Sequence, residues 1–539
     1  MVTGWLNDIS MLGRLAWDIR PFLKNPLTTQ EARQILQQRL ETRGQRFLDM
    51  ARSAIYGNPR SPYLQLLRAT GCELGDITAL VVKEGLEQAL SRLSDAGVYV
   101  TFDEFKGRSE AVRGNRRFAF AEEDFDNPNL SPHYEAQSGG SRSPGTAVKV
   151  ALPFITDLAA ASLLALEAHG LSRWDHAIWL IAAVTPTLLY AKLGRTPLAW
   201  FYPVNPLPMK VKAGALYLAS LGRVFGTPFP IPRFLDLKEP AAMAVWLARR
   251  LEEGRSICVT TYASLAVQIA AAAKEQGILL RGVCFITLGE PFTEAKQKIV
   301  ESVEARPLVR YAFTEAGIIG FQCGEPRLSD DMHFFSDRYG LIQRTRAVGD
   351  SGLSVDAFLF TSLLAAAPKI LLNVESGDYG DLGQWTCNCR MGTAGLTTHV
   401  GRVRSFEKLS GEGMTFVQTD LLRVLEEVLP ARFGGTGSDY QLLEEEAAEG
   451  GLRLRLVVSP RLGDVDEARV RDTFLKELGG VEGFGRLSAR VWRRAATLEV
   501  RRQWPAVTKA GKILPFHLLK RQRPSAQPRP VTRVPPAKP

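Results

Sequence analysis

The chain has few cysteines and no apolar run long enough to cross a membrane. Its six cysteines among 539 residues are too sparse for a disulfide framework, and they suit a reducing compartment where thiols pack, bind metal or react. The longest apolar runs, such as residues 178–184, stop well short of the roughly 20 residues that a transmembrane helix needs. The first residues include Asp8 and lack the uninterrupted apolar core of a signal peptide. We therefore expect a cytoplasmic protein with no transmembrane segment.

The sequence also lacks the signature of a nucleic-acid-binding module. The net charge is +10, but part of the excess lies after residue 519, where basic residues have no acidic neighbours. In the rest of the chain the two signs of charge are interspersed, which differs from a basic nucleic-acid-binding stripe. Moderate basicity fits a polyanionic small ligand equally well. We expect no nucleic-acid partner.

The sequence is too long for a single ordinary domain, and its pattern of apolar and polar residues changes along the chain, which divides it into three parts. Residues 1–135 are mostly helical in pattern, and residues 150–320 alternate amphipathic helices with short apolar strands, as in a layered α/β domain. We predict a large α/β N-terminal domain over 1–402 and a small mobile α+β domain over 403–520. The Pro- and Arg-rich residues 521–539 have almost nothing apolar to bury, and we expect a disordered tail.

A loop rich in glycine and hydroxyl residues precedes the apolar segment 148–154. Such a loop curls its backbone N–H groups around phosphate oxygens, and serine and arginine side chains add donors. Taken alone, a surface loop explains it as well. Its candidate phosphate-binding residues are Ser138, Gly140, Ser141, Arg142 and Ser143.

Polar clusters follow two strands that the pattern predicts. Gly289, Glu290 and Pro291 come after one strand, and Tyr311 with Thr314 and Glu315 ends the next. Because ligands bind at the carboxyl ends of strands in open α/β sheets, we expect the two clusters in one site. Tyr311 offers a face to a purine, and the Glu315 carboxylate suits Mg²⁺.

Three further positions extend this set of polar residues. Asp378 follows a glycine, and its carboxylate is suited to accept hydrogen bonds from both ribose hydroxyls. Arg402 also follows a glycine, and its guanidinium pairs well with phosphate. Lys512 places an ammonium group on a Gly-flanked loop, although most single lysines are simply solvated.

In their order and spacing, these motifs resemble those of the adenylate-forming superfamily of acyl-CoA synthetases, luciferases and peptide-synthetase adenylation domains. The resemblance covers residues 138–514 through the hydroxyl-rich loop, Tyr-x-x-Thr-Glu, Gly-Asp, Gly-Arg and a C-terminal Gly-Lys. The segments Gly-Glu-Pro-Phe-Thr at 289–293 and Met-His-Phe-Phe at 332–335 are most similar to the phenylacetate-CoA ligase branch and the related acyl-protein synthetases.

This resemblance implies a role for each motif. The loop would bind phosphate, residues 289–291 and Tyr311 would form the adenine pocket, and Thr314 and Glu315 would contact phosphate and magnesium. Asp378 would anchor the ribose with Arg402 as its phosphate or ribose partner, and Lys512 would be the catalytic lysine. Two positions depart from the pattern, because Arg142 replaces a usual threonine and Arg404 stands where an acidic pair is usual. We therefore expect Arg404 to be the hinge between the domains.

The implied reaction joins a carboxylic acid to ATP as an acyl-adenylate and then passes the acyl group to a thiol. Coenzyme A is the first expected acceptor, a carrier or protein thiol the second, and an amine the third. An inactive nucleotide-binding homologue is the alternative of a different class, and a homodimer is left open. Apolar residues between the motifs favour an aryl or fatty acid, although core packing explains each of them too: Ala182, Ala183, Leu188, Leu189, Tyr190, Trp200, Phe201, Tyr202, Phe285 and Phe313.

A metal site is predicted apart from these motifs. Cys323 and His333 form a Cys-x9-His pair, and Cys387 and Cys389 form a Cys-x-Cys pair, which together supply the four ligands of a tetrahedral zinc site. Some members of the similar branch carry a structural zinc. His399 is a reserve ligand, and reduced, partly buried thiols are the alternative.

Overall fold

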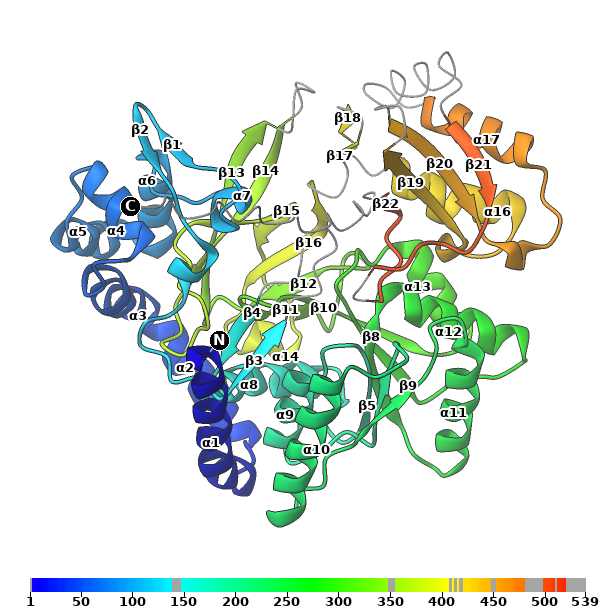
Figure 1. The fold of residues 1–539 in the computed structure, drawn as a ribbon, viewed down its shortest axis with the longest axis horizontal. Helices are drawn as coiled ribbons and strands as arrows, with labels where there is room; N and C mark the ends of the chain where they lie inside the picture. The colour runs from blue at the N-terminus through cyan, green and yellow to red at the C-terminus, as the bar shows by residue number, and fades with distance from the viewer. Residues whose placement is uncertain are drawn as a thin grey trace, which may run out of the picture.

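The computed structural model describes residues 2–137, 147–347, 354–406, 410–411, 414–415, 420–446, 452–479, 498–508 and 511–519. A helical N-terminal region leads into one large central sheet, and a smaller sheet follows near the C-terminus (Figure 1). The expected disordered tail, 521–539, lies outside these residues. None of the helices described is long and apolar enough to cross a membrane.

The N-terminal region consists mainly of helices, as the apolar spacing predicts. They are α1 (Val2–Lys24), α2 (Thr29–Glu41), α3 (Arg43–Met50), α4 (Pro62–Ala69), α5 (Leu74–Glu84), α6 (Leu86–Asp95) and α7 (Phe102–Phe105). Thr28 caps α2 in a reciprocal capping box, because its Oγ1 accepts from the Glu31 N–H at 3.3 Å and the Glu31 carboxylate accepts from the Thr28 N–H at 2.8 Å. The pattern over 76–96 is divided in two at Gly85, whose φ of 84° ends α5.

The central sheet has twelve strands and changes character in its middle. Its parallel half comprises β7 (Pro232–Phe234), β6 (Ala199–Tyr202), β5 (Asp175–Trp179), β8 (Ile257–Tyr262), β9 (Val283–Leu288) and β10 (Arg306–Phe313). From β10 the sheet continues antiparallel through β11 (Gly317–Gln322), β12 (Met332–Phe334), β16 (Thr398–Ser405), β15 (Val374–Gln384), β14 (Ser354–Ser362) and β13 (Tyr339–Ala347). The carboxyl ends of the parallel strands therefore meet beside the place where the connections change direction.

Helices pack around the parallel half: α8 (Leu152–Ala168), α9 (Val184–Lys192), α10 (Met209–Val224), α11 (Pro240–Glu252), α12 (Ala263–Glu275) and α13 (Glu294–Glu301). All six residues of β8 are buried, so this strand shows no alternation of buried and exposed positions. Smaller elements complete the region: β1 (Ala111–Arg113) with β2 (Arg116–Phe118), β3 (Tyr134–Gln137) with β4 (Ala147–Val150), α14 (Arg390–Thr393), and β17 (Ser410–Gly411) with β18 (Met414–Thr415).

The C-terminal region has a sheet and a hydrophobic core of its own. The sheet order is β21 (Leu498–Arg502), β20 (Leu452–Val458), β19 (Tyr440–Glu446) and β22 (Phe516–Leu519), with α15 (Asp420–Arg423), α16 (Leu429–Phe433) and α17 (Glu467–Gly479) alongside. The core of the larger region ends at Phe406, and the second core runs from Leu421 to Phe516. The division that we expect after residue 402 therefore falls inside β16, which still pairs with β15 at Ser405.

Polar contacts join the two regions at the helices next to the small sheet (Figure 1). Glu426 is buried and accepts a hydrogen bond from the Thr293 hydroxyl at 2.6 Å, and it pairs with the Lys296 ammonium at 2.8 Å. Arg461 pairs with Glu275 at the end of α12 at 3.1 Å. These contacts hold the C-terminal region against α12 and α13.

Candidate functional site

A cavity of about 450 Å³ opens at the carboxyl ends of β5, β8, β9 and β10. The segment that leads into β22 contributes to its lining, so the cavity is formed by both regions of the chain. Nine of the predicted site residues line it: Gly289, Glu290, Pro291, Tyr311, Thr314, Glu315, Asp378, Arg404 and Lys512. Residues that are far apart in the sequence thus meet in one place, as expected for a ligand site at strand ends.

Tyr311 of β10 and Asp378 of β15 contact each other directly. The Tyr311 hydroxyl donates a hydrogen bond to the Asp378 carboxylate at 2.8 Å, and the Asp378 N–H donates to the Ser376 hydroxyl at 3.2 Å. Burial, and then the nearby Asp378 charge, raise the pKa of Tyr311, so its phenol stays protonated and keeps donating. The pair presents a ring and a carboxylate on one wall of the cavity.

Glu315 is held by a lysine from the N-terminal region. Its carboxylate pairs with the Lys106 ammonium at 2.5 Å, and Lys106 also pairs with Glu122 at 2.9 Å. Two carboxylates therefore share one ammonium group, so Lys106 neutralises only part of the Glu315 charge. Carboxylate oxygens are the ligands that Mg²⁺ prefers, so the chemistry of Glu315 and its surroundings fits this ion.

Gly289 makes room for Lys512. A Cβ at position 289 would lie 2.7 Å from the Lys512 Nζ, and the residue has a φ of 78°, which favours glycine. The Lys512 ammonium also lies over the Tyr262 ring, 5.4 Å from its centroid. The lysine of the C-terminal region thus reaches the carboxyl end of β9.

Glu290 is engaged in a local contact. Its carboxylate accepts hydrogen bonds from the Ser264 N–H at 2.7 Å and from the Ser264 hydroxyl at 2.9 Å, at the first turn of α12. Burial raises the pKa of Glu290. The Glu290 side chain therefore joins the end of β9 to the start of α12. Its carboxylate is already engaged, so only the backbone near Glu290 is left to contact an adenine.

The two arginines of β16 have different surroundings. Arg404 lines the cavity, is nine-tenths buried and donates to the buried Asp330 carboxylate at 3.0 Å. Arg402 is absent from the lining, keeps 59% of its side chain exposed and pairs with Asp381. The pairing of β15 with β16 shifts register between Tyr379 and Asp381, and Arg402 has a φ of 47°, so the usual alternation of side chains breaks here.

One end of the cavity is apolar. Its lining there includes Phe154, Leu158, Leu180, Pro186 and Ile318 together with three residues of the predicted acid pocket, Ala182, Leu189 and Phe313. The other residues of that predicted pocket are buried in the core instead: Ala183, Leu188, Tyr190, Trp200, Phe201, Tyr202 and Phe285. Core packing, the alternative for each of them, is what the structure shows.

The predicted phosphate loop, with Ser138, Gly140, Ser141, Arg142 and Ser143, lies outside the described residues. The strands on either side of it, β3 and β4, pair antiparallel and contribute lining residues to the cavity.

Four charged lining residues are missing from the set predicted from sequence: Lys106, Arg108, Arg310 and Asp330. Arg310 is the one charged residue in the run 307–313, which was an available signal. Lys106 lies 209 residues from its partner Glu315, and no local pattern connects them.

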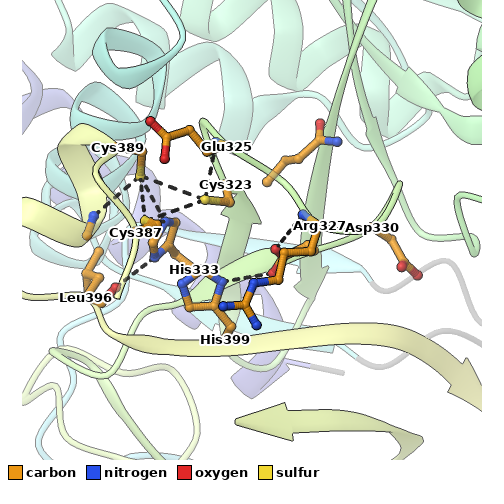
Figure 2. Close-up of polar contacts among 12 residues, drawn as sticks. Cys323, Glu325, Arg327, Asp330, His333, Cys387, Cys389, Leu396 and His399 are labelled. Carbon is orange, nitrogen blue, oxygen red and sulfur yellow. Dashed lines mark hydrogen bonds and ion pairs between the residues drawn. The ribbon is translucent and has the colours of Figure 1, made fainter. Parts of the chain in front are cut away.

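The cysteines and histidines of the predicted metal site converge on one place, as Figure 2 shows. The Cys323 Sγ lies 3.7 Å from that of Cys387 and 3.9 Å from that of Cys389, and the latter two are 3.3 Å apart. The His333 Nε2 is 3.0 Å from the Cys389 Sγ and 3.4 Å from the Cys387 Sγ. Sulfur and nitrogen ligands of a tetrahedral zinc stand about 3.5–3.8 Å apart. The distances here run from 3.0 to 3.9 Å, so these four side chains can hold that ion after small shifts.

Neighbouring groups orient this donor set. The Nδ1 of His333 lies 2.7 Å from the Leu396 carbonyl oxygen, which fixes a proton on Nδ1 and leaves the Nε2 lone pair toward the sulfurs. His399 lies next to the set, with its Nδ1 2.8 Å from an Asp331 carboxylate oxygen and its buried Nε2 without a partner among the described residues. A hydrogen bond from the Cys323 thiol lowers the pKa of Cys389 and favours its thiolate.

No protein-family model matches the sequence, and a search of curated proteins finds no match. Among solved structures, the chain is similar to 2-hydroxyisobutyryl-CoA ligase in the postadenylation state in complex with R3-HIB-AMP, with 15% identity, 89% of each chain covered and a TM-score of 0.52. A weaker likeness is to the anthranilate CoA ligase AuaEII, with 9% identity, 79% of this chain and 74% of that chain covered, and a TM-score of 0.42. Another is to the amide bond synthetase McbA from Marinactinospora thermotolerans, with 13% identity, 90% of this chain and 98% of that chain covered, and a TM-score of 0.40. The likeness to 2-hydroxyisobutyryl-CoA ligase confirms the predicted fold class, a large α/β region followed by a small α+β region, and this chain has the fold of that ligase.

Proposed function

We propose that the chain activates a carboxylic acid with ATP to form an acyl-adenylate and then transfers the acyl group to a thiol. The observation that carries this proposal is the meeting of separately predicted residues in one cavity, with Lys512 entering from the C-terminal region over Gly289. The similar CoA ligase was solved in a postadenylation state with R3-HIB-AMP, which supports an adenylate as the product of the first step.

In that step, an oxygen of the substrate carboxylate attacks the α-phosphorus of ATP, and the bond to the pyrophosphate oxygen breaks. Catalysis then depends on holding two anions together and on neutralising the charge that builds on the phosphoryl oxygens. Lys512 takes the position between the carboxylate and the α-phosphate, where its ammonium offsets both charges. Tyr311 and Asp378 hold the nucleoside, with the carboxylate toward the ribose hydroxyls.

Glu315, with Thr314 beside it, would hold Mg²⁺, which adds charge neutralisation at the phosphates when bound. In the structure Lys106 neutralises part of the Glu315 charge and so competes with a cation for that carboxylate. Arg404 is the arginine of β16 that can reach a bound nucleotide, because it lines the cavity and Arg402 does not. The hinge role predicted for Arg404 is a separate proposal.

The acceptor is proposed on the resemblance alone. Coenzyme A comes first, since the structurally similar protein is a CoA ligase; a carrier or protein thiol comes second and an amine third. The phenylacetate-CoA ligase branch stays a prediction from the two short segments quoted above. The proposed domain rotation would require the contacts of Glu426 with Thr293 and Lys296 to break.

We also propose a structural zinc bound by Cys323, His333, Cys387 and Cys389. Their mutual distances support it, and a bound zinc would fix β11, β12 and the segment before α14 to one another. His399 is the alternative fourth ligand in place of Cys389, because one of its ring nitrogens lies within 4.8 Å of the ligand atoms of Cys323, His333 and Cys387.

Carboxylate-dependent exchange of labelled pyrophosphate into ATP tests the proposed activity. We expect exchange with some members of a broad acid panel, dependent on Mg²⁺ and independent of coenzyme A. Adding coenzyme A, a carrier protein or an amine then identifies the acceptor. Absence of exchange with every acid, while ATP still binds, would show an inactive nucleotide-binding homologue instead.

A further inference from the structure

Arg310 is a buried cation at the apolar end of the cavity. It lies in the middle of β10, lines the cavity and keeps only 7% of its surface exposed. Among the described residues no carboxylate pairs with its guanidinium, and its Nε has no hydrogen-bond partner. A charged group this deeply buried normally has a counter-ion.

The surroundings of Arg310 are aromatic and aliphatic. The next residue, Tyr311, turns toward Asp378, so Arg310 turns to the opposite face of the strand, where Tyr190 of α9 is its electrostatic neighbour. Its guanidinium lies 5.9 Å from the centroid of the Phe321 ring. The Tyr190 hydroxyl is already within hydrogen-bond distance of the Thr260 hydroxyl, at 2.7 Å. These neighbours offer no negative charge to the guanidinium.

An arginine remains protonated inside proteins, so burying it without a partner costs free energy. Burial lowers the pKa of Arg310, which expresses the same cost. A neutral oxygen would satisfy an N–H group and leave the charge uncompensated, whereas a carboxylate satisfies both. The planar guanidinium also matches a carboxylate with two parallel hydrogen bonds.

We propose that Arg310 binds a second carboxylate of the acid substrate, so that the substrate class is a compact dicarboxylic acid. One carboxylate is activated beside Lys512, and the other pairs with Arg310 at the apolar end. The cavity, of about 450 Å³, would also hold the nucleotide, so the room left for the acid favours a short or single-ring acid over a long fatty chain. This inference rests on the proposed acid activation and changes its expected substrate from a plain aryl or fatty acid.

Matched acid pairs test the proposal, in which a methyl group replaces one carboxylate: succinate against butyrate, and terephthalate against 4-methylbenzoate. In pyrophosphate exchange we expect kcat/KM to be at least about 10-fold higher for one of the dicarboxylates than for its partner. Arg310→Met should lower kcat/KM for that dicarboxylate by about 10- to 100-fold and leave the monoacid unchanged or improved. Arg310→Lys should recover part of the loss, since it restores a cation without the planar fork.

Arg306→Met is the matched control, because Arg306 lies on the same strand and is exposed. This variant should leave kcat/KM unchanged for both acids of the pair. Arg310→Met should fold, since an apolar side chain replaces an unpaired buried charge, and its melting temperature checks this. Exchange that favours the monoacids and is insensitive to Arg310→Met would overturn this inference and leave acid activation standing.

Calorimetric titration of the dicarboxylates separates the two proposals when no acid supports exchange. Absence of exchange with every acid would overturn the proposed acid activation. Dicarboxylate binding that is then lost in Arg310→Met would still support the anion site, and equal heats with both proteins would reject it.

Discussion

The Cys/His cluster takes all its donors from one corner of the central sheet, between Cys323 and His399, whereas the cavity depends on Lys512 from the C-terminal region. The cluster is therefore complete whatever the position of the C-terminal region. The cavity is complete only while the contacts of Glu426 and Arg461 hold the two regions together. We therefore propose that the cluster contributes stability and the cavity contributes chemistry, and each can be removed separately.

Lys512→Ala should distinguish the role of the cavity from that of the Cys/His cluster most strongly. We expect pyrophosphate exchange to fall by about 100- to 1,000-fold, because the ammonium that offsets charge in the transition state is removed. Thioester formation from a supplied acyl-adenylate should stay largely intact, and zinc content and melting temperature should not change. Lys298→Ala is the control, since that lysine is exposed and its ion pair in the described part of the chain is with Glu294 on its own helix. Equal loss of both half-reactions would contradict the role of Lys512.

Removing the metal should have the opposite effect to Lys512→Ala: it should lower stability and leave pyrophosphate exchange nearly unchanged. Elemental analysis of protein purified without chelators should find one zinc per chain, and Cys387→Ser should abolish it and lower the free energy of unfolding by about 4 kcal/mol or more. Exchange measured well below the melting temperature should change little. Cys72→Ser, outside the cluster, should keep its zinc. Protein without zinc before any chelator treatment would reject the site.

The fourth ligand can be identified with two further variants. Cys389→Ser and His399→Gln change the two competing donors, and only the true ligand should lower zinc content and unfolding free energy strongly. The contacts of the Cys389 Sγ with the three other donor atoms favour Cys389 as that ligand. Retention of zinc in Cys389→Ser with loss in His399→Gln would assign the position to the histidine.

The same contrast explains what could be predicted from the sequence. Apolar periodicity located β8, β9, α11 and α12 to within a few residues, because burial of one face or of both faces determines those patterns. The meeting of Tyr311 with residues 289–291 followed from strand ends in an α/β sheet, and Asp378 joined this set through the resemblance. The pairing of Lys106 with Glu315 joins two distant segments, and the left-handed backbone at Arg402 arises from a local register shift. Neither leaves a periodic signal, since both depend on how particular strands and loops meet.

The two arginines of β16 provide the smallest and most local test. Arg404→Ala should raise the KM for ATP in the exchange reaction by about 10-fold, because it removes a cavity-lining cation and leaves the buried Asp330 carboxylate without that partner. Arg402→Ala should change the KM by less than about 3-fold, since it removes an exposed ion pair with Asp381. Melting curves of both variants show how much of the Arg404 effect is structural. A larger increase in KM for Arg402→Ala than for Arg404→Ala would assign the nucleotide contact to Arg402. It would also mean that β16 changes its register with β15 when the nucleotide binds.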